Sequence, residues 1–212
     1  MAAAERRQNM EITLIRHFRT PGNGRGQYIG STEESIDPAG IPRNIPRFRR
    51  PDILAVSPMR RCIQTASLLY PGMEMAVYPQ FREMDFGEYE GKTYEELKDE
   101  PAYQRWMESG GLTAFPGGED RESFQRRCLL GMEKLLQESF RQGYERAAVV
   151  AHGGTLMAVL SACSPGKESF YHWQVENGGG YQAEADGEEW LAGRRIFRRI
   201  RRIGREAGSR DL

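Results

Sequence analysis

Two of the three histidines in this 212-residue chain stand after apolar runs that are typical of buried β-strands. His17 comes at the end of the run that starts at Ile12, and His152 follows the run 147–151. In an open α/β sheet, the ligand site lies outside the carboxyl ends of the strands. We therefore expect these two histidines, delivered by separate strands, to converge on one bound group.

Arg16 and the residues that follow a third strand-like run predict that this group is an anion with phosphate geometry. Arg16 precedes His17, and a third strand-like run is followed by Ser57 and Pro58. Serine is a preferred N-cap and proline is favoured at the first helical position, so a helix should begin directly after that strand, with Arg61 in its first turn. Free N–H groups at a helix start and a guanidinium that can donate two parallel bonds both favour a phosphate.

The turn after His152 repeats this arrangement. Gly153 and Gly154 permit a tight turn, and Thr155 is placed to cap the helix that follows. Two helix starts, together with the arginine before His17, predict a strongly electropositive pocket.

In such a pocket a histidine can act as a nucleophile. A neutral imidazole, with an ordinary pKa of about 6.5, has a free lone pair at pH 7, and nearby arginines oppose a further positive charge. Attack on phosphorus gives a phosphohistidine, and the leaving alkoxide then needs a proton from a carboxylic acid that can later activate water. The spacing leaves four carboxylic acids open for this role: Glu83, Asp85, Glu88 and Glu90.

The elements that must position these residues alternate along the chain, which predicts an α/β fold: three αβα layers around a mainly parallel sheet. Strand-like runs are Glu11 to Arg16, Asp52 to Ser57, Glu74 to Tyr78 and Arg146 to Ala151. Helical patterns are Pro58 to Leu69, Thr93 to Ser109, Arg121 to Gln142 and Thr155 to Ala162.

We expect one domain, 1–212, because no linker is long enough to divide the chain. The segment 82–118 is too short for a domain of its own and is interpreted as a cap-like insertion over the strand ends. A final hairpin is expected to pair 181–184 with 190–196 across Asp186-Gly187. The segment 194–212 forms a basic tail.

That tail holds eight arginines and two acidic residues, a net charge of +6, which leaves −6 for the other 193 residues of this neutral chain. An exposed edge strand or helix followed by a solvated end explains the tail better than nucleic-acid binding, because no aromatic stacking platform accompanies the charge.

Apolar residues make up 39% and charged residues 28%, and no apolar run is long enough to span a membrane. We expect a cytoplasmic protein, a monomer or homodimer, that binds neither nucleic acid nor membrane.

The three cysteines are Cys62, Cys128 and Cys163, in no metal-binding pattern. They are interpreted as reduced thiols, and Cys62, beside the expected site, as small core filler rather than a redox-sensitive group.

Beyond these arguments, the chain resembles the histidine phosphatase superfamily, whose best-known branch is the cofactor-dependent phosphoglycerate mutases. LIRHFRT (14–20) resembles the RHG signature of the family. Other family motifs follow in the same order: Asn23 with Tyr28-Ile29-Gly30, SPMRRCIQTA (57–66), FREMDFGEYEG (81–91), FPGGED (115–120) and VVAHGGTL (149–156). The resemblance implies a phosphoglycerate mutase-like fold.

The resemblance also implies the role of each site residue. His17 is the phosphorylated nucleophile, Arg16, Arg61 and His152 hold the phosphoryl oxygens, and Glu83 is the proton donor. The implied substrate-binding residues are Asn23, Gly153, Thr20 and Tyr28. No metal or other cofactor is implied, because arginines supply the charge stabilisation.

One departure from the family pattern is Phe18, where the family has glycine after the nucleophile. Glycine lets the backbone approach a phosphate closely, so Phe18 must point away or narrow the mouth of the site. Arg19 follows, either as a contact for a second anionic group of the substrate or as a solvated surface residue.

The function expected is hydrolysis of a small phosphorylated metabolite through a phosphohistidine. Met84-Asp85-Phe86 follows Glu83 where the mutases carry an Arg-His-Tyr run, which favours a phosphatase over a mutase. Among phosphatases the motifs look most like those of α-ribazole phosphatases, which remove a 5′-phosphate during assembly of the cobalamin lower ligand. The alternatives are a mutase-type phosphotransferase, a non-catalytic phospho-ligand binding protein in which Phe18 has spoiled the chemistry, and a metallohydrolase, which two histidines without a DxD or HxH pair support poorly.

Overall fold

The computed structural model describes residues 9–166 and 168–204 and contains one mixed, mostly parallel sheet of six strands. The strand order is β3-β2-β4-β1-β5-β6. The first four strands are parallel to one another, β5 is antiparallel to β1, and β6 is antiparallel to β5. Their bounds are β1 Asn9–Arg16, β2 Ile53–Val56, β3 Met75–Val77, β4 Arg146–Ala151, β5 Gly180–Asp186 and β6 Phe197–Ile203.

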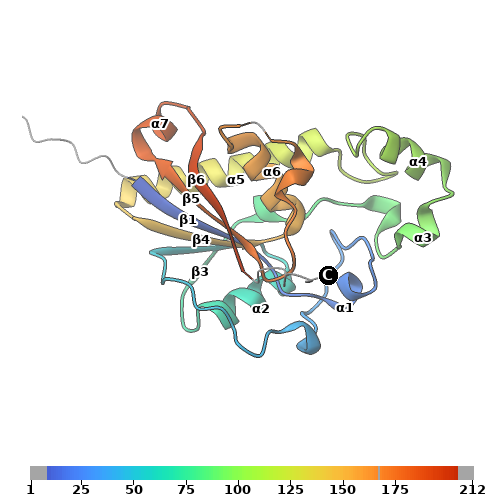
Figure 1. Cartoon of the computed structure of the whole chain (residues 1–212), viewed down its shortest axis with the longest axis horizontal. Helices are drawn as coiled ribbons and strands as arrows, with labels where there is room; N and C mark the ends of the chain where they lie inside the picture. Colours follow the sequence, from blue (N-terminus) through green and yellow to red (C-terminus); the bar gives the residue numbers. More distant parts are fainter. Residues whose placement is uncertain (1–8, 167, 205–212) are drawn as a thin grey trace, which may run out of the picture.

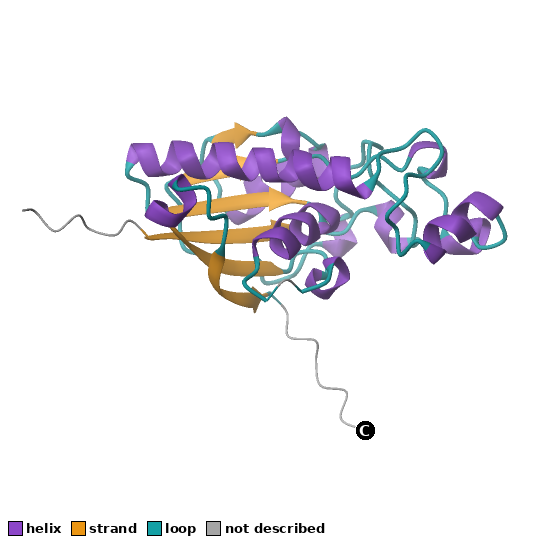
Figure 2. Cartoon of the chain, turned by 90° about the horizontal axis from the view of Figure 1, so that it is seen from above, coloured by secondary structure: helices purple, strands orange, loops and turns teal. Residues whose placement is uncertain are grey.

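Helices cover both faces of this sheet, as the α/β pattern predicts (Figures 1 and 2). The helices are α1 Pro21–Gly24, α2 Arg60–Leu69, α3 Tyr94–Leu97, α4 Pro101–Glu108, α5 Arg121–Gln142, α6 Gly153–Cys163 and α7 Gly187–Leu191. Because side chains alternate along a strand, Leu14 packs into the larger core cluster with α5 and α6, while Ile15 packs into the smaller one with α2. Short 3₁₀ turns are η1 Pro38–Gly40, η2 Pro79–Phe81, η3 Gly87–Tyr89 and η4 Phe170–Trp173.

The segment 82–118 extends from one end of the sheet and carries α3 and α4 (Figure 1). It has its own small core, formed by Tyr89, Leu97, Tyr103 and Phe115. One helix over 93–109 was the wrong expectation, because Pro101 begins α4 and disfavours helical geometry in the residue before it. The division of the chain into one domain with a cap-like insertion stays a prediction.

The last part of the chain differs from the expected hairpin. Asp186 does not start a tight turn but caps α7, where its side chain accepts a hydrogen bond from the backbone N–H of Glu189. The strand that pairs with β5 is therefore β6, and Trp190 lies in the helix between them. The arginine-rich strand β6 lies at the sheet edge as expected, and the part of the basic tail after 204 lies outside the described residues.

Two composition-based expectations are met within the described residues. All three cysteines are free and buried in the core. No helix of this part of the chain is both long and apolar enough to cross a membrane.

Candidate active site

Parallel pairing brings the two strand-end histidines together. Arg16 and Ala151 are partners in the β1–β4 ladder, and the backbone N–H of His17 donates to the Ala151 carbonyl at 3.0 Å. The next residue after β4 is His152, and the centroids of the two imidazole rings lie 5.2 Å apart. The predicted convergence at the carboxyl edge of the sheet is therefore present.

The tautomer of His17 is determined by a backbone carbonyl. Nδ1 lies 2.7 Å from the carbonyl oxygen of Phe18, which can only accept, so Nδ1 carries the proton and Nε2 keeps its lone pair. Burial, and then the charges of Arg61 and Arg16, hold the pKa of His17 well below its usual value. The ring is consequently neutral at pH 7, with an unprotonated Nε2.

His152 is also neutral, with the opposite tautomer. The Nε–H of Arg61 donates to His152 Nδ1 at 3.3 Å, so Nδ1 accepts and Nε2 carries the proton. Nε2 lies 2.8 Å from Ser57 Oγ and donates to it. Burial and the nearby charge of Arg61 lower the pKa of His152 well below its usual value.

The two arginines differ in burial and in hydrogen bonding, because Arg61 is fully buried and Arg16 only partly. Arg61 also donates to the carbonyls of Gly30 and Thr32, at 2.8 and 2.7 Å. Arg16 donates through Nη1 to the Val175 carbonyl at 2.7 Å, while its buried Nε has no partner among the described residues. Since buried N–H groups are nearly always hydrogen-bonded, this donor in the cavity wall fits an anionic oxygen.

Among the four candidate acids, Glu83 is the one at the cavity wall. Its carboxylate accepts backbone N–H groups from Met84 and Gly154, both at 3.0 Å. Burial raises its pKa, although those two hydrogen bonds and the charges of Arg61 and Arg16 oppose the rise. Of the others, Asp85 and Glu88 are exposed and Glu90 accepts from the backbone of 30–32.

Asn23 is oriented by residues on both sides of it. Its Oδ1 accepts from the backbone N–H of Thr20 at 3.3 Å and from Asn177 Nδ2 at 3.2 Å. Because Oδ1 is occupied, the amide group of Asn23 can present N–H donors at the cavity. Asn177 also donates to the His17 carbonyl at 3.1 Å. The sequence analysis did not identify Asn177, which lies 160 residues from the carbonyl to which it donates.

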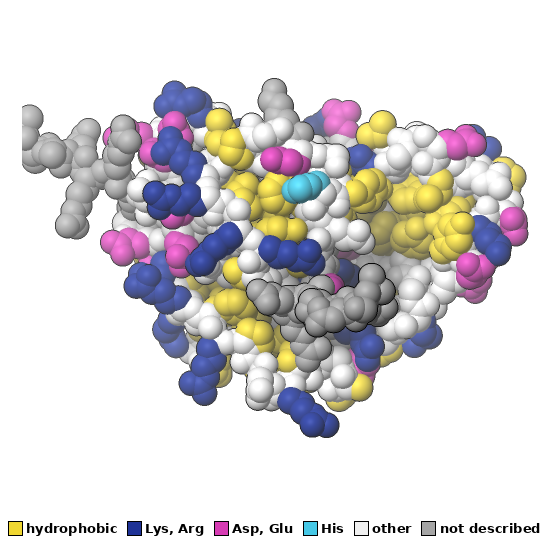
Figure 3. Space-filling model, viewed as in Figure 1, with side chains coloured by type: hydrophobic (Ala, Val, Ile, Leu, Met, Phe, Trp, Pro, Cys, Tyr) yellow, Lys and Arg dark blue, Asp and Glu magenta, His cyan; other side chains and the backbone are white. Residues whose placement is uncertain are grey.

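A cavity of about 220 Å³ opens beside these groups. Six of the nine predicted site residues line it, whereas Arg61, His152 and Thr20 are fully buried behind its wall, and Thr20 caps α1. The remaining wall is largely apolar, and hydrophobic side chains gather in a hollow beside α3 and α4 (Figure 3). Its aromatic members are Tyr28, Phe86, Trp106, Phe124, Phe170 and Tyr171.

The unusual Phe18 points away from this cavity. It is 1% exposed and packs into the core cluster on the α2 face of the sheet. Its backbone N–H donates to Thr65 Oγ1 at 2.9 Å. Arg19 is half exposed and pairs with Asp37 at 2.9 Å, so it does not belong to the cavity wall.

Two predicted helix caps are wrong. Ser57 bonds His152 rather than starting a helix, and α2 begins only at Arg60, with Arg61 in its first turn as expected. The helix after His152 already begins at Gly153, so Thr155 lies inside it and its hydroxyl donates to the Phe81 carbonyl.

Comparisons with known proteins identify the family of this chain. Residues 12–195 match the model of the histidine phosphatase superfamily (branch 1), and the chain belongs to that family. It is 29% identical over 172 residues to a metal-independent phosphoserine phosphatase of Arabidopsis thaliana, covering 74% of this chain and 71% of that protein. It is 27% identical over 179 residues to the adenosylcobalamin/α-ribazole phosphatase of Salmonella typhimurium, covering 80% and 87%.

The fold is likewise shared with a solved phosphoglycerate mutase of Bacillus anthracis. The two structures superpose with a TM-score of 0.70 over 90% of this chain and 91% of the other, at 17% identity. The expected phosphoglycerate mutase-like α/β fold is thereby confirmed.

Proposed function

We propose that this protein hydrolyses phosphate monoesters through a phosphohistidine on His17. The observation that carries the proposal is the His17 tautomer: Nδ1 donates to a backbone carbonyl, which leaves Nε2 as the nucleophile. Arg16, whose Nε has no partner among the described residues, and the amide of Asn23 supply N–H donors at the cavity, and the charge of Arg61 acts on the phosphoryl group from behind the wall.

In the first step, Nε2 of His17 attacks phosphorus and the P–O bond to the leaving group breaks. The departing oxygen takes its proton from Glu83, whose raised pKa favours the protonated form at the start of the cycle. The alcohol then leaves the apolar part of the cavity.

In the second step, the Glu83 carboxylate takes a proton from water as the water oxygen attacks the phosphohistidine. The P–N bond breaks, inorganic phosphate forms, and both His17 and Glu83 return to their starting protonation states. Arg16 and the nearby charge of Arg61 stabilise the phosphoryl oxygens throughout, so the cycle needs no metal.

Rapid mixing with p-nitrophenyl phosphate tests this cycle. We expect an acid-labile phosphoenzyme, release of inorganic phosphate, insensitivity to EDTA, and loss of turnover in His17→Ala. His172→Ala is the matched control, because His172 is exposed and outside the cavity wall, and it should keep full activity.

Three outcomes would contradict hydrolysis. Transfer of the phosphoryl group to a second alcohol instead of water would indicate a mutase. Phosphate-ester binding without turnover would indicate a binding protein, and strict metal dependence would indicate a metallohydrolase.

For the natural substrate, the aromatic wall favours a small phosphorylated metabolite with a flat, apolar group, such as α-ribazole 5′-phosphate. Glu83 is the only carboxylic acid among the described residues of the wall, so phosphoserine would find no separate partner for its ammonium group. We expect a higher kcat/KM for α-ribazole 5′-phosphate than for phosphoserine. A higher kcat/KM for phosphoserine would instead indicate that phosphoserine is the natural substrate.

A further inference from the structure

Glu83 lies in a stretch of chain with little regular structure to hold it. The stretch 82–86 runs between the short turns η2 and η3 and belongs to no helix or strand. On one side it borders the active-site cavity, and on another a second hollow of about 520 Å³. Glu83 lines both spaces, so packing alone does not determine where its carboxylate lies.

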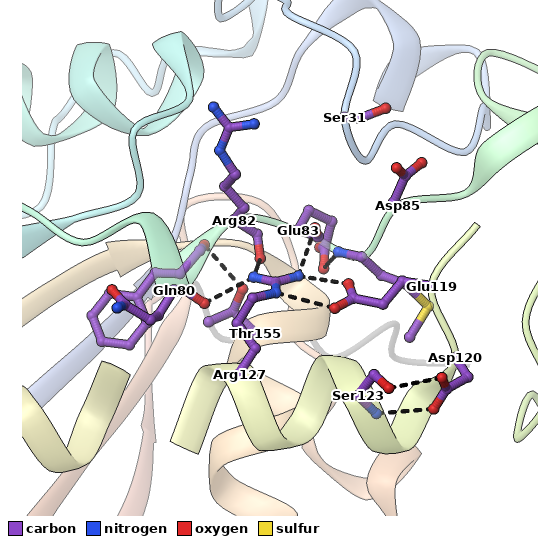
Figure 4. A network of polar contacts seen from close by, with 12 residues as sticks. Ser31, Gln80, Arg82, Glu83, Asp85, Glu119, Asp120, Ser123, Arg127 and Thr155 are labelled. Carbon is purple, nitrogen blue, oxygen red and sulfur yellow. Dashed lines mark hydrogen bonds and ion pairs between the residues drawn. The ribbon is translucent and has the colours of Figure 1, made fainter. Parts of the chain in front are cut away.

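Besides the N–H groups of Gly154 and Glu119, which donate to the Glu83 carboxylate and the Asp85 carbonyl, the side chain of Arg127 on α5 holds this stretch. Its Nη1 donates to the carbonyls of Gln80 and Arg82 at 2.9 and 3.0 Å, and its Nη2 donates to the carbonyl of Glu83 at 3.3 Å. The guanidinium thus binds three carbonyl oxygens within four consecutive residues. Figure 4 shows the Arg127 side chain reaching from the helix to this stretch.

Glu119 fixes the guanidinium from the other side. Its two carboxylate oxygens accept from Nε and Nη2 of Arg127, at 3.1 and 2.6 Å (Figure 4). Glu119 does not cap α5, because Asp120 takes that role by accepting from the backbone N–H of Ser123. The carboxylate of Glu119 is therefore available to orient Arg127.

Together these contacts use every N–H direction of the guanidinium: one at Nε, two at Nη1 and two at Nη2. A lysine ammonium cannot reproduce this planar arrangement. The pair also adds no net charge next to the active site. Five directed hydrogen bonds and a neutralised charge are typical of an arginine that positions the backbone. An arginine that only adds charge to the surface needs neither.

We infer that the Glu119–Arg127 pair is a positioning device for the proposed proton donor, because it holds the backbone that carries Glu83. The inference rests on the proposed function, in which Glu83 protonates the leaving oxygen. Neither Arg127 nor Glu119 lines the active-site cavity, so they act through Glu83 and not on the substrate.

The test uses two substrates that differ in their need for a proton donor. An alkyl phosphate has a poor leaving group that must be protonated, whereas nitrophenolate leaves as a stable anion. For each ester, kcat/KM reports the steps up to phosphoenzyme formation. In Arg127→Lys we expect kcat/KM for the alkyl ester to fall on the order of tenfold more than for p-nitrophenyl phosphate, with a smaller change of the same direction in Glu119→Gln.

Arg126→Lys is the matched control. Arg126 neighbours Arg127 on α5, but it is exposed and pairs with Glu122 one turn away. We expect Arg126→Lys to keep the wild-type ratio of kcat/KM for the alkyl ester to kcat/KM for p-nitrophenyl phosphate. In a Glu83→Gln background, Arg127→Lys should change the ratio no further, because the donor that it positions is gone.

Each outcome decides the inference. If folded Arg127→Lys keeps the wild-type ratio of kcat/KM for the alkyl ester to kcat/KM for p-nitrophenyl phosphate, the inference is overturned. It is also overturned if Arg127→Lys still changes this ratio in the Glu83→Gln background. If Arg127→Lys fails to fold, Glu119→Gln supplies the same comparison. A wild-type enzyme that forms no phosphohistidine refutes the proposed function itself and this inference with it, whereas an active wild type with an insensitive ratio refutes the inference alone.

Discussion

The carboxylate of Glu83 rests directly against the backbone of Gly154, whose N–H donates to Glu83 Oε2 at 3.0 Å. A β-carbon at Gly154 would lie 2.2 Å from Glu83 Oε1, far inside van der Waals contact. The second glycine after His152 therefore does more than permit a turn, because its missing side chain leaves the space that the acid occupies.

Gly154→Ala should displace the Glu83 carboxylate and reduce activity. General acid catalysis contributes about 10²–10⁴-fold, so we expect kcat/KM for an alkyl phosphate to fall on the order of 100-fold. Gly24→Ala is the control, since the nearest atoms to its new β-carbon would lie at 3.9 Å. Steady-state kinetics of the two variants, with thermal melts to confirm folding, check this prediction. Full activity in Gly154→Ala would show that Glu83 can work from another position.

The pH dependence should follow from the opposite pKa shifts of His17 and Glu83. Burial lowers the pKa of His17, so the nucleophile stays neutral well into the acidic range. Burial raises the pKa of Glu83, and the proton donor is lost only as pH rises through that raised pKa. With an alkyl phosphate, kcat/KM should hence be high on the acidic side and fall towards alkaline pH.

Glu83→Gln tests the assignment of that alkaline limb. The amide of glutamine cannot titrate, so we expect kcat/KM for the alkyl phosphate to be about 10²–10⁴-fold lower. The fall in kcat/KM towards alkaline pH should also disappear. The ionisation of the ester itself, near pH 6, affects both proteins equally. An unchanged alkaline limb in Glu83→Gln would mean that another group donates the proton.

The sequence predicts well those parts of the site that depend on strand ends. Because parallel strands end at one edge of the sheet, the order of motifs was enough to bring His17, His152 and Arg61 together. The bounds of β4 and α5 also agree with the sequence pattern, since β4 is a continuous buried strand and α5 is a regular helix with a cap at each end.

The other parts of the site depend on contacts between segments that lie far apart in the chain. Ser57 looked like a helix cap until its hydroxyl proved to be a partner of His152, 95 residues away. Asn177 lies 160 residues from the His17 carbonyl to which it donates. No local periodicity encodes such pairs, and spacing alone could not choose Glu83 over its acidic neighbours.

The aromatic wall should determine which leaving group is preferred. Trp106 lines the cavity and packs on Phe115, with ring centroids 4.5 Å apart. Trp106→Ala should raise KM for α-ribazole 5′-phosphate about tenfold, because a flat group loses a stacking partner. KM for a short alkyl phosphate should change little. Equal effects on both esters would assign Trp106 to the small core of segment 82–118 instead of to substrate binding.

Phe18, where the family has glycine, should support stability rather than chemistry. Its ring is buried against the α2 face of the sheet, and Thr65 holds its backbone N–H, so Phe18→Ala leaves a cavity in the core and not in the site. A buried phenylalanine truncated to alanine costs about 3–5 kcal/mol of unfolding free energy. Urea denaturation should show that loss, while the folded fraction at low temperature keeps a kcat within about threefold of the wild type. A large rise in kcat with unchanged stability would instead mean that Phe18 obstructs the phosphate site.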